Sequence, residues 1–217
     1  MSRRARLVVP GIPHHITQRG NRRQQTFFRE DDYDLYKDAM SHCCRTEGVA
    51  VWCYCLMPNH THLIAVPPTS EALRRAVGEA HRSYTNHINQ REGWSGFLWQ
   101  GRFASFPLDP AHLHSCARYI ERNPVRAGIV GAPEDWPHSS ARAHLLRHDD
   151  ILVRYGPLIE RIGDWRSYLD MPDPPSLSLS LRQHMRTGQP FGEESFVVQV
   201  QGMLERMSTG EESGNIP

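Results

Sequence analysis

The feature that most constrains the fold is a pair of strand-like runs, residues 49–57 and 60–66, separated only by Pro58 and Asn59. Both runs are rich in β-branched and aromatic residues, which favour strands. Proline and asparagine favour a turn between them. Two strands joined by so short a connection must pair antiparallel, so the sequence predicts a β-hairpin.

Helix-like and strand-like segments surround this hairpin, and their periodicity predicts the fold class. In order they are a strand over residues 12–18, a helix over 31–46, the hairpin, a helix over 70–93, a strand region over 98–108 and a helix over 110–123. Ser70 and Asp109 are the expected N-caps of the last two helices, and Pro124 should end the final one. The order predicts an α/β (α+β) fold with a ferredoxin-like βαββαβ antiparallel sheet and helices on one face.

A change of character near residue 145 predicts two parts. Residues 1–145 contain the strands and helices just described, and residues 146–217 are expected to form a C-terminal helical extension. A final helix is expected over residues 194–207, followed by a loose polar tail. A chain of 217 residues, 39% of them hydrophobic, can bury a sizeable core.

Arginine dominates the positive charge. Only one of the 25 basic residues, Lys37, is a lysine. Seven arginines precede Glu30, the first acidic residue: Arg3, Arg4, Arg6, Arg19, Arg22, Arg23 and Arg29. A biased genome composition could explain the preference for arginine, but it does not explain the clustering. Because the planar guanidinium binds phosphate in a bidentate manner, this distribution indicates a nucleic-acid partner.

Other classes of protein are disfavoured by what the sequence lacks. No run of eighteen apolar residues occurs, and the basic start has no apolar stretch of the kind found in a signal peptide. We therefore expect no membrane partner and a cytoplasmic location. The five cysteines are an odd set within predicted secondary structure, which favours reduced thiols over a disulfide framework.

His60 and His62 are the strongest chemical signal. They stand two residues apart on a predicted strand, so both side chains point to one face and can share a metal ion. Tyr119 and Asn123 stand four apart on a predicted helix and also share a face. Together the two pairs could form a site in which a metal withdraws charge from a phosphate, asparagine completes the coordination and the tyrosine oxygen attacks.

Two other interpretations of these residues remain open. Tyr119 could simply pack on the sheet, with Asn123 as an ordinary helix-end residue. Alternatively, Cys53 and Cys55 could face the same side of the hairpin as the histidines and form a structural zinc site. The spacing of one residue within each pair is not the usual two to four of zinc fingers, so buried thiols are favoured.

Three motifs occur in order along the chain. They are Met57-Pro-Asn-His-Thr-His62, Trp99-Gln-Gly-Arg-Phe103 and Tyr119-Ile-Glu-Arg-Asn-Pro-Val-Arg-Ala-Gly128. They resemble the REP-associated tyrosine transposases, within the wider HUH superfamily of single-strand transposases, and the resemblance covers roughly residues 5–145. Two features depart from that pattern. Thr61 replaces a bulky hydrophobic residue, and the C-terminal end is acidic where related chains often finish with basic residues.

The resemblance implies a role for each member of the candidate site. His60 and His62 would hold a divalent ion, and Asn123 would be the third ligand. Tyr119 would be the nucleophile that becomes linked to the DNA 5′-phosphate and leaves a free 3′-hydroxyl. Partly open, oxygen-rich coordination suits Mg²⁺ or Mn²⁺ better than zinc.

The resemblance also implies a DNA partner, namely palindromic repeats that fold into hairpins beside a short single strand. Such an enzyme would nick and rejoin DNA as a monomer or homodimer in the bacterial cytoplasm, associated with the nucleoid. The candidate DNA contacts are Arg19, Asn21, Arg22, Arg23, Trp99, Gln100 and Arg102, with a core position as the alternative for Trp99. The rival function is a domesticated protein that binds DNA or RNA hairpins without cutting them.

Overall fold

The predicted hairpin is present in the structure, a computed structural model that describes residues 6–160 and 162–209. β2 (Ala50–Met57) and β3 (His60–Val66) pair antiparallel. β1 (His14–Arg19) pairs with the other edge of β3, and β4 (Ala104–Pro107) pairs with β1. The strand order β2-β3-β1-β4, with every pairing antiparallel, confirms the predicted fold class.

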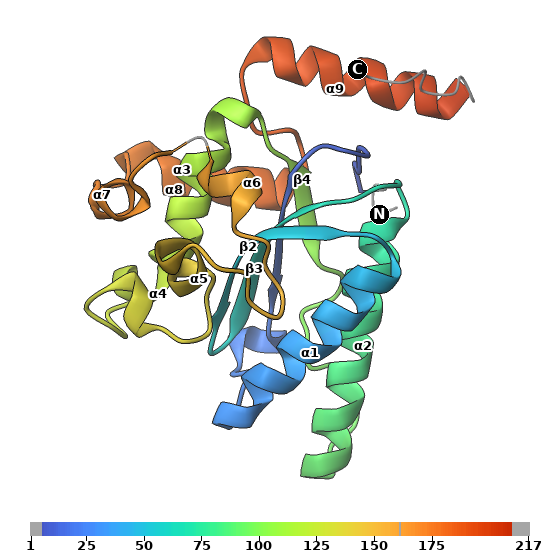
Figure 1. Ribbon diagram of the computed structural model, residues 1–217. Coiled ribbons are helices and arrows are strands. Elements are labelled where there is room, and N and C mark those ends of the chain that lie inside the picture. The colour runs from blue at the N-terminus through green and yellow to red at the C-terminus, as the bar shows by residue number, and fades with distance from the viewer. Residues whose placement is uncertain (1–5, 161, 210–217) are drawn as a thin grey trace.

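One face of the sheet is covered by two long helices that lie side by side, α1 (Glu30–Thr46) and α2 (Ala72–Glu92) (Figure 1). Their apolar faces meet the side chains that β3 directs toward them, Leu63 and Ala65. The core on this side contains several aromatic side chains, of which Tyr36 and Tyr84 are almost fully buried. This layer is the one that the sequence predicted.

The two helices of the βαββαβ unit lie on one face as predicted, and the opposite face is covered by helices that follow this unit in the chain. α3 (Pro110–Glu121) packs there together with α6 (Gly156–Ile159), α7 (Trp165–Asp170) and α8 (Pro175–Thr187). The sheet requires this second layer because it also presents apolar residues on this side, among them Cys53, Ile64 and Phe106, which are 0% exposed.

The remaining elements are short, with one exception. They are η1 (Asn21–Arg23), α4 (Asn123–Arg126), η2 (Pro133–Asp135), α5 (Ala141–Leu146) and the longer α9 (Glu194–Thr209). α9 lies apart from the sheet at the top of Figure 1 and packs on Val9 through Phe196 and Val200. It confirms the predicted final helix; of the predicted tail, residues 210–217 lie outside the described residues.

Several predicted boundaries differ from the structure. The N-cap of α2 is Glu71, not Ser70, and its side chain makes no capping hydrogen bond. Asp109 caps α3 as predicted, because its carboxylate accepts from the backbone N–H of Ala111. Of the strand region over residues 98–108, only β4 is a strand. Residues 98–103 instead form a loop whose Gln100 N–H bonds to the carbonyl of Arg19 at the end of β1.

The hydrophobic core crosses the predicted domain boundary at residue 145. Leu158, Trp165 and Leu181 from the extension share one apolar cluster with Ile64 and Phe106 from the sheet. The boundary between residues 1–145 and 146–217 stays a prediction, since no comparison divides the chain there. Within the described part of the chain, no helix is long and apolar enough to cross a membrane.

The burial of α8 generates a stability prediction. Leu181 is 0% exposed, whereas Leu179 on the same helix is 67% exposed. Replacing Leu181 with alanine should lower the free energy of unfolding by about 2–5 kcal/mol, since it leaves a cavity in the shared core. Leu179→Ala should change it by less than about 0.5 kcal/mol. Urea unfolding curves of both variants test this, and equal effects would contradict the packing described here.

Candidate active site

The four residues predicted to carry the chemistry lie around one pocket of about 690 Å³ on the α3 side of the sheet. His60 and His62 come from the start of β3, and their rings are perpendicular with centroids 5.1 Å apart. Tyr119 belongs to the last turn of α3, and its ring centroid is 6.2 Å from that of His62. Asn123 begins α4. The structure thus brings together the strand pair and the helix pair.

A break in the helix separates Tyr119 from Asn123 without separating their side chains. α3 ends at Glu121, and α4 begins at Asn123 after one intervening residue, Arg122, at φ −82° and ψ 0°. This departure from helical geometry is small, so two residues four apart still face the same pocket. Pro124 is accommodated because it stands in the first turn of α4, where a missing N–H costs nothing.

Hydrogen bonds orient both histidine rings. Nε2 of His15 lies 2.8 Å from Nδ1 of His62, and Oδ1 of Asn59 lies 2.7 Å from Nδ1 of His60. Each bond engages the Nδ1 atom and leaves Nε2 of the same ring for another partner. Metal-binding histidines are commonly held in this way, by a second group on the other nitrogen.

Burial and positive neighbours keep these imidazoles neutral. Burial lowers the pKa of His60 to about 4, with Arg19 and Arg126 as further causes. Burial also holds the pKa of His62 well below its ordinary value, helped by His15 and His60. Neutral imidazole is the form that binds metal, so this environment favours coordination near neutral pH.

The donor set fits a divalent cation with open coordination positions. It comprises two neutral imidazoles and the side chain of Asn123, which lines the same pocket, is 9% exposed and could offer its amide oxygen. No group of three or more His, Cys, Asp or Glu side chains suited to a metal occurs within residues 6–160 and 162–209. The zinc interpretation therefore gains no support; Cys53 and Cys55 are fully buried, and burial raises the pKa of both thiols.

Tyr119 is held tightly by Arg126. The guanidinium carbon of Arg126 lies 3.8 Å from the centroid of the Tyr119 ring, and Nη2 donates to the Tyr119 backbone oxygen at 3.0 Å. Asp173, which precedes α8, accepts from Arg126 at 3.3 Å and from Arg118 at 3.1 Å. Arg126 thus covers the tyrosine ring and is itself held by Asp173, a residue of the C-terminal extension.

Comparison with known proteins decides the family. The model of the family described as "Transposase IS200 like" matches residues 8–123, more than half of the chain. The chain belongs to the IS200-like transposase family. A REP-associated tyrosine transposase from Haemophilus influenzae is 28% identical over 123 residues, which are 51% of this chain and 69% of the relative.

One solved structure supports the fold of this family member. A REP-associated tyrosine transposase bound to a REP hairpin superposes with a TM-score of 0.55 at 23% identity, covering 71% of this chain and 92% of that one. At this identity the match shows the fold alone. A transposase from Deinococcus radiodurans R1 superposes with a TM-score of 0.39, too low to add to the argument.

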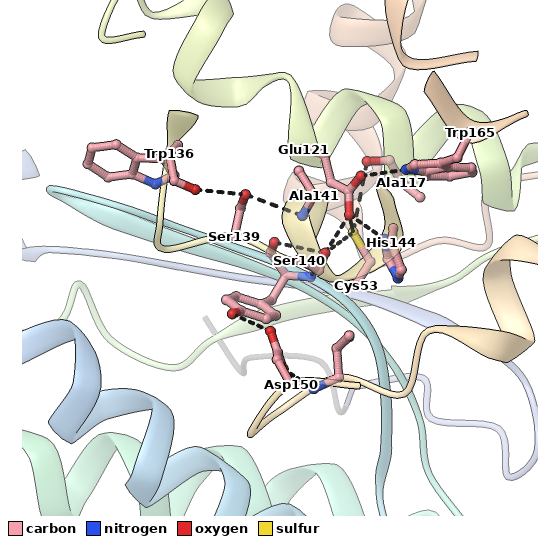
Figure 2. Close-up of polar contacts among 12 residues, drawn as sticks. Cys53, Ala117, Glu121, Trp136, Ser139, Ser140, Ala141, His144, Asp150 and Trp165 are labelled. Atoms are coloured by element: carbon pink, nitrogen blue, oxygen red, sulfur yellow. Dashed lines mark hydrogen bonds and ion pairs between the residues drawn. The ribbon is translucent and has the colours of Figure 1, made fainter. Parts of the chain in front are cut away.

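A buried carboxylate anchors the helix that carries Tyr119. Glu121 is 0% exposed, and its Oε1 accepts from Ser140 Oγ and from His144 Nδ1, both at 2.5 Å (Figure 2). Its Oε2 accepts from Trp165 Nε1 at 2.9 Å. An unpaired carboxylate at this depth would be very costly, so these donors fix α3 against α5 and α7. Tyr119 and Asn123 lie two residues on either side of Glu121, so the anchoring of Glu121 also fixes the backbone that carries them.

The predicted DNA contacts divide into groups. Four of them line the pocket: Arg19, Arg23, Gln100 and Arg102. Asn21 instead ties η1 to the neighbouring loop through the backbone oxygen of Phe97, and Arg22 is exposed beside it in the left-handed region at φ 53°. Trp99 is 6% exposed and packs on His81, so the structure favours its alternative role in the core.

Sequence reasoning missed several residues of the site. His15, Arg126 and Arg182 all touch the site or its lining, yet no spacing rule relates them to the histidine pair. Arg126 lies within the Tyr119–Gly128 motif and seven residues after Tyr119, so helical periodicity offered a signal for it. His15 and Arg182 are brought in only by strand pairing and by the packing of α8.

The lowered pKa of His60 can be measured directly on the metal-free protein. Its imidazole should titrate with a midpoint near pH 4, and Arg126→Ala should move the midpoint upward because one repelling charge is removed. Since the folded pKa lies below the unfolded value of about 6.5, the contribution of His60 to stability is present above pH 6.5 and is lost as pH falls toward 4. Long-range ¹H–¹⁵N spectra of the ring report the midpoint; a value near 6.5 would contradict the described environment.

Proposed function

We propose that this chain is a transposase-type endonuclease and strand transferase, which binds single-stranded DNA hairpins of palindromic repeats and cuts them through Tyr119. The observation that carries the proposal is the convergence of Tyr119 with His60, His62 and Asn123 on one pocket. The substrate class is suggested by the similar transposase whose structure contains a REP hairpin. All four residues come from the same chain, so one protomer can supply a complete site.

The proposed reaction uses the Tyr119 phenol as nucleophile. Its oxygen attacks a backbone phosphorus, the bond from phosphorus to the 3′-oxygen breaks, and overall the phenolic proton passes to that departing 3′-oxygen. The products are a 5′-phosphate linked to Tyr119 and a strand that ends in a 3′-hydroxyl. Attack by a 3′-hydroxyl on the phosphotyrosine reverses these bonds and rejoins DNA, and with a different 3′-end the result is strand transfer.

The protein's own residues would prepare this step by orientation. Arg126 holds the Tyr119 ring from one side, and Glu121 fixes the helix behind it. His60, His62 and Asn123 would hold the divalent ion, for which we propose Mg²⁺ or Mn²⁺. When bound, such an ion supplies charge withdrawal at the phosphate. Positioning of nucleophile and phosphate in one pocket supplies the rest of the rate advantage.

Tyr119→Phe tests the nucleophile. The substitution removes only the phenol oxygen and keeps the ring beneath Arg126, so hairpin affinity should stay within about twofold while the covalent adduct disappears. Labelled hairpin DNA with a single-stranded flank, incubated with Mg²⁺ or Mn²⁺ and run on a denaturing gel, shows the adduct. An adduct with the phenylalanine variant would sink the assignment, and binding by the wild type without any adduct would favour the non-cutting module.

His60→Ala combined with His62→Ala tests the metal ligands. Cleavage stimulated by Mn²⁺ should fall by at least about 100-fold because the ion loses its imidazole ligands. Hairpin binding should persist and remain salt-sensitive, since it depends on arginine. His87→Ala, at an exposed position on α2, is the control and should cut like the wild type. Unchanged cleavage by the double variant would reject the metal site.

A further inference from the structure

The C-terminal extension contributes directly to the pocket. Arg182 and Met185 of α8 line it together with His60, His62 and Tyr119. Arg182 stands 59 residues beyond Asn123, where the match to the family model ends. Helix α8 is therefore a wall of the pocket that lies outside the residues matched by the family model.

The packing of α8 holds its arginines in place. Leu177 and Leu181 are buried in the core beneath the pocket. At its C-terminal end, the chain turns at Gly188, φ 71°, and Phe191 then donates its N–H to the carbonyl of Pro107 in β4. Arg182 directly follows the fully buried Leu181. Its position is thus set by the core, although its side chain is exposed.

The charges on this wall lack protein partners. Neither Arg182 nor Arg186 forms an ion pair within the part of the chain that the structure describes. Two other arginines of the extension are paired, Arg154 with Asp149 and Arg166 with Glu134. Arg182 also lies close enough to Arg19 to lower the pKa of that guanidinium, after burial and Arg23. Arg19 and Arg182 are neighbouring positive charges with no acidic side chain of the described residues paired to Arg182, so the pocket between them suits a bound anion.

A second basic pocket continues the first. Arg186 lies one helical turn beyond Arg182, a rise of about 6 Å. It lines a pocket of about 460 Å³ together with Arg6 and Arg102. The two pockets share Gln100, Arg102, Ala104 and Met185, so they form one groove. Burial is the main cause that lowers the pKa of Arg6 to about 10, and the positive charges of Arg102 and Arg74 nearby contribute to the same shift.

We infer that α8 is one wall of a groove for single-stranded DNA, in which Arg182 and Arg186 bind successive phosphates of the strand that enters the Tyr119 site. The inference rests on the proposed function, because it concerns the same DNA strand. Arginines on a fixed helix that point at phosphates position the strand and carry no base specificity. The extension thereby acts as part of the substrate-binding surface as well as of the core.

The test measures salt-dependent binding in a background that cannot cut. Fluorescence anisotropy of labelled oligothymidine long enough to span both pockets is followed with Tyr119→Phe protein over a range of salt concentrations. Adding Arg182→Ala and Arg186→Ala should reduce the slope of log affinity against log salt by about 1.4, the value for two lost phosphate contacts on a single strand. The lysine pair, Arg182→Lys with Arg186→Lys, should keep most of the slope because it keeps the charge.

The control removes the same charge elsewhere. Arg142 on α5 and Arg206 on α9 are exposed and line neither pocket, so their double alanine variant should keep the slope of the parent. An unchanged slope in the Arg182/Arg186 variant, or an equal reduction in the control, would overturn the inference. Unfolding midpoints verify that each variant is folded. Wild-type protein that binds DNA but forms no covalent adduct would contradict the proposed cleavage reaction. Binding does not require cleavage, so the salt dependence would still test whether α8 contacts the DNA.

Discussion

Alternation of side chains along β3 determines where chemistry can occur in this protein. Leu63 and Ala65 point toward α1 and α2 and are buried in the larger of the two main core clusters. His60 and His62 point the other way, at the end of the strand where the layer formed by α3 and α8 leaves a pocket. A shift of pairing by one residue would bury the histidines among apolar side chains and expose leucine instead. Register is therefore a condition for the site as well as for the core.

The second layer turns this strand end into a confined site. α3 brings Tyr119 and Asn123 opposite the histidines, and the buried carboxylate of Glu121 fixes α3 to α5 and α7 through three hydrogen-bond donors. A buried charge with satisfied partners contributes little net stability, but it allows one arrangement and penalises others. In the proposed reaction Tyr119 would have to meet a phosphate within a fraction of an ångström, and for that step a single fixed arrangement matters more than added stability.

Positive charge is concentrated around this pocket because the fold brings arginines from several segments of the chain together there. Arg19 comes from the end of β1, Arg102 from the loop before β4, Arg126 from α4 and Arg182 from α8. Arg126 is balanced by Asp173, whereas Arg182 has no acidic partner among the described residues. The formal net charge is only +1, yet the positive charge is distributed unevenly and is concentrated around this pocket. Repulsion among these arginines is a cost in the free protein that a bound polyanion would remove.

Local order was predictable from the sequence alone. The hairpin, α1, the Asp109 cap of α3 and the sheet class follow from periodicity and turn chemistry, which depend on residues close together in the chain. The pairs His60/His62 and Tyr119/Asn123 followed for the same reason, because strand and helix geometry place residues two and four apart on one face. The strand predicted over residues 98–108 was too long, because only Ala104–Pro107 is a strand, and the predicted N-cap of α2 was one residue too early.

Only the tertiary structure decided which residues from distant segments of the chain contact one another. The hydrogen bond from His15 to His62, the donors around Glu121 and the approach of Arg182 to Arg19 join segments far apart in the chain, and no local pattern encodes them. The burial of Trp99 belongs to the same class, since an aromatic residue in a basic motif suits DNA and core equally well. The sequence determined the chemical groups and their local faces. Burial of both sheet faces then determined their assembly, because a four-stranded sheet with two apolar faces must recruit distant helices to exclude water.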